Sequence, residues 1–139
     1  MNAVDTNVFV YARDDDDLGK QAKADMLLGK LLIQRSETVM LWQVASEFLN
    51  CLRRWENEGR ITSTEVEEDF RDILAMFPVR RPALAIFDHS FQLRSRFSLS
   101  HWDSLLLAAC KEAGVETLYS EDLSPTTNCN GVSVINPFA

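Results

Sequence analysis

The sequence is poor in cysteine, glycine and proline, and it has no long apolar run. Its 139 residues include three cysteines, five glycines and four prolines. The cysteines are odd in number and show no C-x-x-C spacing, which argues against a disulfide framework and against a zinc site. We therefore expect Cys51, Cys110 and Cys129 to be reduced and to serve as small apolar residues. The longest apolar run, residues 105–110, is far shorter than the roughly 20 residues of a transmembrane helix.

The N-terminal segment also lacks the features of a secretory signal. It reads MNAVDTNVFV, without a basic residue, and Asp5 stands where a signal peptide needs apolar residues. We therefore expect the protein to stay in the cytoplasm. Hydrophobic residues make up 46% of the chain and charged residues 25%, as in ordinary globular domains, which excludes disordered and fibrous classes. A length of 139 residues favours a single domain over residues 1–139.

Acidic residues outnumber basic ones and are concentrated toward the two ends of the chain. Lys and Arg total 14 against 21 Asp and Glu, a net charge of −7 that argues against sequence-independent binding of nucleic acid by the whole surface. Residues 1–50 carry 8 acidic and 5 basic side chains, residues 51–100 carry 8 of each, and residues 101–139 carry 5 acidic and 1 basic. If the two ends meet in the fold, their carboxylates form a negative site that a metal ion or a basic partner must neutralise. The run Asp14–Asp17 is unlike an EF-hand loop, and we expect a solvated loop at a helix N-terminus there.

Short apolar runs alternate with amphipathic segments along the chain, and Thr62 with Glu65 forms a T-x-x-E capping-box signal. We expect strands over residues 1–4, 38–42, 115–119 and 132–135, with a short additional strand from residue 79. We expect helices over residues 18–34, from 43 to Gly59, from 62 to 77, from 82 to about 97 and from 100 to Gly114. Residues 5–7 are expected to form a polar loop after the first strand. Strands that alternate with helices predict an α/β fold with a parallel sheet covered on both faces.

Four carboxylates are expected to lie at one end of this sheet. Asp5 and Asp122 follow predicted strands, Glu47 lies in the first turns of a helix that follows a strand, and Asp103 lies in the first turn of another helix. Ligands bind at the carboxyl ends of parallel strands, where the strand order reverses. Like charges that close together raise one another's pKa values, and a divalent cation is the simplest remedy. Mg²⁺ and Mn²⁺ prefer carboxylate oxygens and can activate water against a phosphodiester, so the pattern points to metal-dependent phosphodiester hydrolysis.

Each of these acids also has an ordinary structural interpretation. Asp103 follows Ser100 by three residues, so it can simply cap its helix. Glu47 near a helix start favours the helix dipole, and Asp122 suits a turn. Asp5 can form an Asx turn, but it ends an apolar strand and is expected to be partly buried, where an unpaired charge is costly. Of the four, Asp5 is therefore the residue that a structural role explains least well.

Taken together, the motifs resemble those of the PIN-domain ribonucleases, and within them the VapC-like toxins of type II toxin–antitoxin systems. The segments that carry the resemblance are VDTNVFVYA, WQVASEFLN, HWDSLLLAAC, LYSEDL and the closing GVSVINPF, which follow one another in the family's order. The resemblance implies a three-layer α/β/α sandwich with a short, mostly parallel central sheet. It further implies an endoribonuclease that a cognate antitoxin protein silences, and a homodimer that assembles with the antitoxin into a larger complex.

The same resemblance assigns roles to individual residues. The family's acidic quartet, which carries catalysis and binds Mg²⁺ or Mn²⁺, matches Asp5, Glu47, Asp103 and Asp122. Polar positions that help to order the acids or the substrate match Thr6, Asn7 and Ser120. In the fourth motif Glu121 is adjacent to Asp122 and either carboxylate can reach the site; we favour Asp122 as the fourth acid.

The arginines of the middle segment are candidates for contacts with RNA phosphates at the rim of the acidic pocket. They are Arg53, Arg54, Arg80, Arg81, Arg94 and Arg96. Solvated charges in a segment of zero net charge explain them equally well. From charge alone, we also expect a basic side chain of the antitoxin, such as an arginine, to enter the acidic pocket and pair with its carboxylates.

Three other functions stay open at this point. A catalytically idle PIN-like module that only binds protein does not need the acids, yet all four are present. A receiver domain shares the sheet type and an acidic pocket, but it needs a lysine at the end of its last strand, and Lys111 lies on a predicted helix. A phosphatase with an aspartyl nucleophile carries a second acid two residues later, where this chain has Asn7. Glycine-rich nucleotide loops and the G-x-S-x-G motif of serine hydrolases are missing from the sequence.

Overall fold

The computed structural model describes residues 1–123, 128–129 and 131–139. Its strands are β1 (Asn2–Val4), β2 (Thr38–Leu41), β3 (Val79–Arg80), β4 (Thr117–Tyr119), β5 (Asn128–Cys129) and β6 (Val132–Ile135). Its helices are α1 (Thr6–Arg13), α2 (Leu18–Leu32), the short 3₁₀ helix η1 (Arg35–Glu37), α3 (Trp42–Asn57), α4 (Ser63–Leu74), α5 (Ala85–Arg96) and α6 (His101–Glu112).

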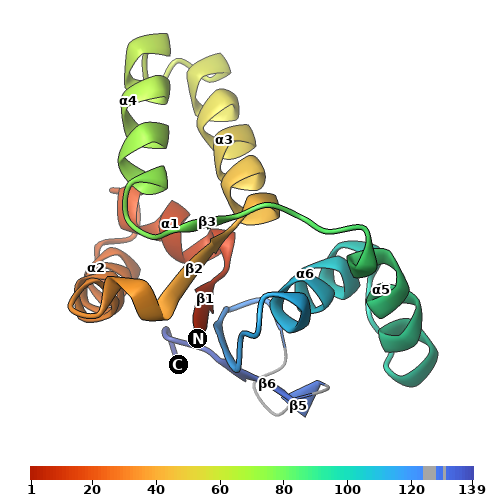
Figure 1. The fold of residues 1–139 in the computed structure, drawn as a ribbon. Coiled ribbons are helices and arrows are strands. Elements are labelled where there is room, and N and C mark those ends of the chain that lie inside the picture. The colour runs from red at the N-terminus through yellow and green to blue at the C-terminus, as the bar shows by residue number, and fades with distance from the viewer. Residues whose placement is uncertain (124–127, 130) are drawn as a thin grey trace.

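The strands form one sheet in the order β3-β2-β1-β4-β6-β5. Every pairing is parallel except that of β5 with β6, which is antiparallel. In Figure 1 the sheet lies between α1 and α2 on one side and α5 and α6 on the other, while α3 and α4 form an antiparallel pair that projects away from it. The predicted α/β fold with a mostly parallel sheet between helices is confirmed.

The order of the strands creates a switch point beside β1. The chain passes from β1 to β2 on one side, whereas β4 pairs with β1 on the other side. The connections from β1 to β2 and from β4 to β6 therefore lead to opposite sides of the sheet, which leaves a crevice at the carboxyl ends of β1 and β4. Residues that directly follow β1 and β4 are placed at this crevice.

The predicted amphipathic face of α3 is buried as expected. Val44, Phe48, Cys51, Leu52 and Trp55 all lie in the core, because their spacing keeps them on one side of the helix. After the helix ends, Gly59 takes a φ of 77°, a left-handed conformation that favours glycine. The helix that precedes β4 is likewise buried along most of its length, from Ser104 to Cys110 with Leu105 half-buried.

The segment after β1 is a helix, and the predicted polar loop there is wrong. Asp5 caps α1 directly, and Val8 and Phe9 on that helix are fully buried. The eight residues of α1 are too few for a repeating apolar pattern to be recognised in the sequence.

Other element boundaries also differ from those expected. The helix predicted from Pro82 begins at Ala85, so the proline lies before the helix rather than in its first turn. The preceding helix ends at Leu74 rather than at residue 77, and β4 begins at Thr117 rather than at residue 115. The expected helix at residues 18–34 ends at Leu32, and a 3₁₀ turn follows.

Cysteine and membrane predictions can be compared only with the described residues. Cys51 and Cys110 are free and buried, and burial raises the pKa of both thiols, so they stay neutral and act as apolar residues. The side chain of Cys129 lies outside the described part of the chain. No helix in the described ranges is both long and apolar enough to cross a membrane.

We expect the capping box of α4 to contribute measurably to stability. The Glu65 amide donates to Thr62 Oγ1 at 3.1 Å, and the Thr62 amide donates to Glu65 Oε1 at 3.2 Å. Thr62→Ala should lower the free energy of unfolding in urea by about 1 kcal/mol, because it leaves the Glu65 amide without its capping partner. Thr64→Ala, at an exposed position in the same turn, is the control and should change it by less than about 0.5 kcal/mol. Equal losses in both variants would contradict a role for the cap.

Candidate active site

Asp5 is the most buried of the four predicted acids. It follows β1 at the switch point, its side chain is 7% exposed, and its amide donates to the Tyr119 carbonyl of β4 at 2.9 Å. Its carboxylate accepts two hydrogen bonds, from the Thr6 amide to Oδ1 at 2.7 Å and from Ser120 Oγ to Oδ2 at 2.7 Å. The first of these bonds also caps α1, so the start of the helix and the orientation of Asp5 depend on each other.

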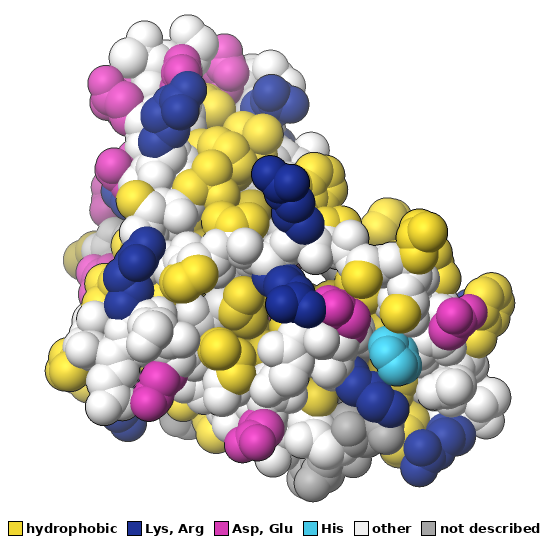
Figure 2. Space-filling model, in the orientation of Figure 1, with side chains coloured by type: hydrophobic (Ala, Val, Ile, Leu, Met, Phe, Trp, Pro, Cys, Tyr) yellow, Lys and Arg dark blue, Asp and Glu magenta, His cyan; other side chains and the backbone are white. Residues whose placement is uncertain are grey.

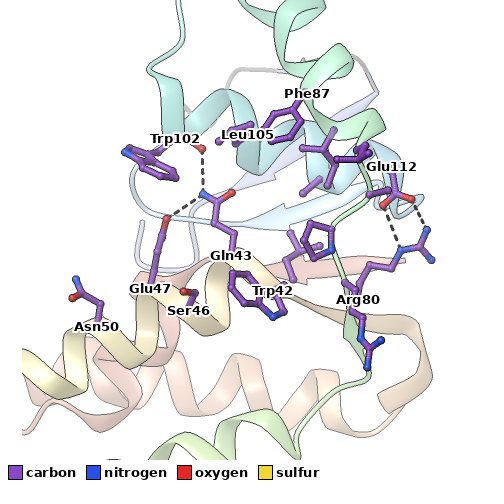
Figure 3. Close-up of a pocket in the computed structure, with 17 residues that line it drawn as sticks. Trp42, Gln43, Ser46, Glu47, Asn50, Arg80, Phe87, Trp102, Leu105 and Glu112 are labelled. Atoms are coloured by element: carbon purple, nitrogen blue, oxygen red, sulfur yellow. Dashed lines mark hydrogen bonds and ion pairs between the residues drawn. The ribbon is translucent and has the colours of Figure 1, made fainter.

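Glu47 lies one turn into α3, where it contacts α1 directly and is linked to the start of α6 through Gln43. Thr6 Oγ1 donates to Glu47 Oε2 at 2.9 Å. Gln43, one turn earlier on α3, donates from Nε2 to Glu47 Oε1 at 3.1 Å and to the Trp102 carbonyl oxygen at 3.3 Å (Figure 3). Gln43 therefore joins Glu47 to the first turn of α6, next to Asp103.

Asp122 lies in the segment after β4 and is held by polar contacts with α1. Asn7 Nδ2 donates to Asp122 Oδ2 at 3.1 Å, and the Asp122 amide donates to Ser120 Oγ at 3.2 Å. The side chain of Glu121 instead pairs with Lys20. Of the two adjacent acids, Asp122 is thus the one that contacts the network around Asp5.

Asp103 occupies the first turn of α6, as predicted. Its amide donates to Ser100 Oγ at 3.2 Å, so the expected S-x-x-D cap is present. Its half-buried carboxylate makes no hydrogen bond or ion pair with any described residue. The structure therefore connects Asp5, Glu47 and Asp122 through shared hydrogen-bonding partners. In the described residues, Asp103 is linked to these acids only through the preceding residue, Trp102, whose carbonyl oxygen accepts a hydrogen bond from Gln43.

The electrostatics of the site are dominated by Asp5. Its pKa is raised to about 6, mainly by burial; the hydrogen bonds from Ser120 and Thr6 oppose the increase, and the negative charges of Glu47 and Asp122 add to it. Among the described residues, no lysine, arginine or histidine forms an ion pair with these acids or with Asp103. The site therefore carries negative charge that nothing in the described chain compensates.

The donor chemistry of the site fits a hard divalent cation. Carboxylate oxygens are the protein ligands that Mg²⁺ and Mn²⁺ prefer, and a cation would favour the ionised form of Asp5. No group of three Asp, Glu, His or Cys side chains that could hold a metal ion occurs in the described ranges. Mg²⁺ usually keeps several waters and takes one or two carboxylates, so three converging carboxylates are not required. By donor type, Asp5, Glu47 and Asp122 fit such an ion.

A mainly apolar cavity of about 730 Å³ adjoins Glu47. In Figure 3, Trp42, Gln43 and Glu47 of α3 line one side of the cavity, and Trp102 of α6 and Phe87 of α5 line the other. Figure 2 shows that exposed hydrophobic side chains continue over the α3–α4 pair, with Lys and Arg side chains beside them. An uncovered apolar area of this kind is typical of an interaction surface.

The predicted RNA-contacting arginines differ in their surroundings. Arg80 pairs with Glu112 at 2.6 Å, and Arg81 lines the cavity beside it. The other four are exposed on α3 and α5 and form no ion pair with a described residue: Arg53, Arg54, Arg94 and Arg96. Their role stays a prediction.

Sequence reasoning missed two residues that support the site. Gln43 precedes Glu47 by four residues, a helical spacing that could have indicated the contact. Lys20 is 101 residues from Glu121, and no local pattern in the sequence connects them.

A protein-family model matches the sequence, and solved structures match the fold. A family model described as PIN domain matches residues 3–124. No curated protein sequence matches this chain.

Among solved structures, a toxin–antitoxin complex from Klebsiella pneumoniae has a TM-score of 0.73 at 17% identity, over 99% of this chain and 98% of that chain. VapBC2 from Rickettsia felis, bound to a DNA fragment from its promoter, has a TM-score of 0.75 at 12% identity, over 97% of both chains. VapC20 from Mycobacterium tuberculosis, described as a toxin that cleaves the sarcin–ricin loop, has a TM-score of 0.63 at 14% identity, over 88% of this chain and 90% of that chain. Identities this low show likeness of fold.

The raised pKa of Asp5 predicts how the metal-free protein responds to pH. The pKa is about 6 in the folded state and 3.8 in an ordinary environment, so folding favours the protonated form. The contribution of Asp5 to stability is therefore full below about pH 4 and is lost as the pH rises through 6. Asp5→Asn stays neutral, so in EDTA at pH 8 it should be more stable than the wild type by roughly 2–3 kcal/mol, since one pKa unit corresponds to about 1.4 kcal/mol.

Urea denaturation of both proteins at pH 4.5 and pH 8 measures this difference, which should fall to about one third at the lower pH, where the folded protein is protonated at Asp5 but the unfolded chain is still largely ionised there. Asp25→Asn changes an exposed carboxyl on α2 and serves as the control. An Asp5→Asn effect that is the same at both pH values would contradict the assignment.

Proposed function

Because this chain belongs to the PIN domain family, we propose that it is a metal-dependent endoribonuclease that acts as the toxin of a toxin–antitoxin pair. The observation that carries the proposal is the hydrogen-bonded network that joins Asp5, Glu47 and Asp122 at the switch point of the sheet. Three carboxylates that come from separate parts of the chain, with no Lys, Arg or His paired to them among the described residues, are poorly explained as structural residues.

The metal, Mg²⁺ or Mn²⁺, would be held by Asp5 with Glu47, Asp103 and Asp122, and would supply activation of water and stabilisation of the leaving oxygen in phosphodiester hydrolysis. Polar groups of the chain orient three of these acids, Asp5, Glu47 and Asp122, by hydrogen bonds. The Thr6 amide and the Ser120 hydroxyl stabilise the ionised form of Asp5.

Two further polar side chains orient the other acids. The Thr6 hydroxyl holds Glu47, and the Asn7 amide holds Asp122. Because Thr6, Asn7 and Ser120 each donate a hydrogen bond to an acid, we propose that their main role is to orient the acids and not to bind the RNA.

A cognate antitoxin is the proposed protein partner. Two of the solved structures with this fold are toxin–antitoxin complexes, at 12% and 17% identity. The uncompensated charge of Asp5 and its neighbours is suited to pairing with a basic antitoxin side chain, which would block the site. The PIN match disfavours the receiver-domain and phosphatase alternatives, so an idle binding module is the alternative that the experiments must exclude.

We further propose that the apolar face of α5 and the neighbouring cavity form a homodimer interface. Leu84 and Phe91 are 83% and 76% exposed, and Phe87, Trp42 and Trp102 are more than half exposed. A second copy of the chain would bury these large side chains, which gain free energy on leaving water.

Nuclease activity is tested with purified, antitoxin-free protein on a mixed pool of structured RNAs. We expect cleavage with Mg²⁺ or Mn²⁺ but not with EDTA. Asp5→Asn and Asp103→Asn should each reduce the rate by about 100-fold or more, since both remove a negatively charged metal ligand. Asp25→Asn should cleave like the wild type, and calorimetry should show Mn²⁺ binding that Asp5→Asn weakens. Cleavage that survives both substitutions would contradict the proposed site, and a folded protein that binds no metal would favour the idle module.

The proposed interface predicts the oligomeric state. Light scattering after gel filtration should give a dimer for the wild type and a monomer for Phe87→Glu and for Phe91→Glu, because each places a charge in the apolar face. Met26→Glu changes an equally exposed apolar residue on α2 and should leave the dimer intact. A monomeric wild type, or dimers in both α5 variants, would overturn the proposed interface.

A further inference from the structure

The structure assigns Lys20 as a positioning residue: by holding Glu121 outside the acidic site, it keeps Asp122 within that site. This inference rests on the proposed function for its consequence in catalysis, but the contacts that carry it are independent of any activity. It also gives a physical reason why Asp122, rather than its neighbour, serves as the fourth acid.

Lys20 is fixed by contacts with three separate parts of the chain. It lies in the first turn of α2, where its amide donates to the capping Asp17 Oδ1 at 3.0 Å. Its Nζ donates to the Glu121 carboxylate and, at 3.2 Å, to Tyr11 Oη on α1. The same ammonium lies 4.5 Å from the centre of the Tyr11 ring and 5.6 Å from the centre of the Phe138 ring. Both rings face the cation at a distance at which their electrons attract it.

The aromatic partners are themselves held in place. Tyr11 and Phe138 contact each other edge to face with ring centres 5.0 Å apart. Phe138 is further held by its amide, which donates to Asn136 Oδ1 at 2.8 Å. Lys20 therefore sits in a preformed setting of one carboxylate and two rings, and its side chain is 32% exposed. A cation held from several sides restrains its carboxylate partner more strongly than an isolated surface ion pair does.

Within the described residues, Asp122 has little else to restrain it. It is exposed, and its hydrogen bonds to described residues are the 3.1 Å bond from Asn7 and the 3.2 Å bond to Ser120. Glu121, by contrast, has a side chain that is 25% exposed, and its amide donates to Asn7 Oδ1 at 3.4 Å. Fixing Glu121 at both its carboxylate and its amide limits the positions that the next residue can take.

The ion pair also keeps a further negative charge out of the site. Asp5 already lies near the charges of Glu47 and Asp122, which raise its pKa. If Lys20 were neutral, the Glu121 carboxylate would lose its partner, would add to this repulsion, and would be free to compete with Asp122 for a cation. Lys20 therefore separates the roles of two adjacent carboxylates.

The test uses Lys20→Met, which keeps an unbranched side chain but removes the charge, and Lys20→Arg, which keeps the charge. Lys23→Met is the matched control, because Lys23 lies on the same helix and donates to the Phe138 carbonyl at 3.2 Å without contacting Glu121. Hydrogen–deuterium exchange of residues 119–123 in metal-free protein measures the restraint directly. We expect faster exchange of this segment in Lys20→Met but not in Lys20→Arg or Lys23→Met.

Calorimetric binding of Mn²⁺ then tests the consequence for the site. Lys20→Met should weaken binding by about 10-fold, as is usual when a residue that orients a ligand is removed. Lys20→Arg should restore most of the affinity. Adding Glu121→Gln to Lys20→Met should cause no further loss, because the two residues act through one contact.

Two results would overturn the inference. One is exchange in residues 119–123 that is unchanged by Lys20→Met, which together with a lower melting temperature would leave Lys20 only a structural role. The other is an Mn²⁺ affinity that Lys20→Met leaves unchanged although exchange becomes faster. A wild type that binds no Mn²⁺ would instead contradict the proposed function, and the exchange experiment would still decide whether Lys20 positions the segment.

Discussion

Asp5 buries its carboxylate at the end of β1, and the cost of that buried charge organises the residues around it. The Thr6 amide and the Ser120 hydroxyl offset part of the cost, yet the pKa of Asp5 still rises to about 6. Both partners also contact a second acid: the Thr6 hydroxyl donates to Glu47, and Ser120 Oγ accepts from the amide of Asp122. Thr6 and Ser120, the residues that stabilise the buried carboxylate of Asp5, are thus also the residues that connect Glu47 and Asp122 to it.

The surroundings of this site differ on its two sides. On one side, Lys20 pairs with Glu121 in the segment after β4 and lies over the rings of Tyr11 and Phe138. On the other side, beyond Glu47, lies an apolar cavity of about 730 Å³ with exposed aromatic side chains. The acidic site therefore lies between a segment held by an ion pair and an apolar surface suited to a partner, which is consistent with the proposed nuclease and its proposed protein partners.

Local sequence patterns predicted those elements that are long and periodic. The face of α3 from Val44 to Trp55 and the capping box at Thr62 were both recognisable, because each depends on residues within a few turns of one helix. The helix α1 was missed because eight residues are too few to show a period. The start of α5 was placed too early because Pro82 suits both a first helical turn and the residues before it.

By itself, the sequence determined the alternation of strands and helices, the acidic motifs in their order and the resemblance that they carry. It left open whether Glu121 or Asp122 approaches Asp5, since the two are adjacent and chemically alike. The tertiary structure decided that Glu121 contacts Lys20, 101 residues away, and that Asp122 contacts Asn7, 115 residues away. Contacts between such distant residues depend on which strands are neighbours in the sheet and on which side chains reach across the crevice, and neither is encoded in a local pattern.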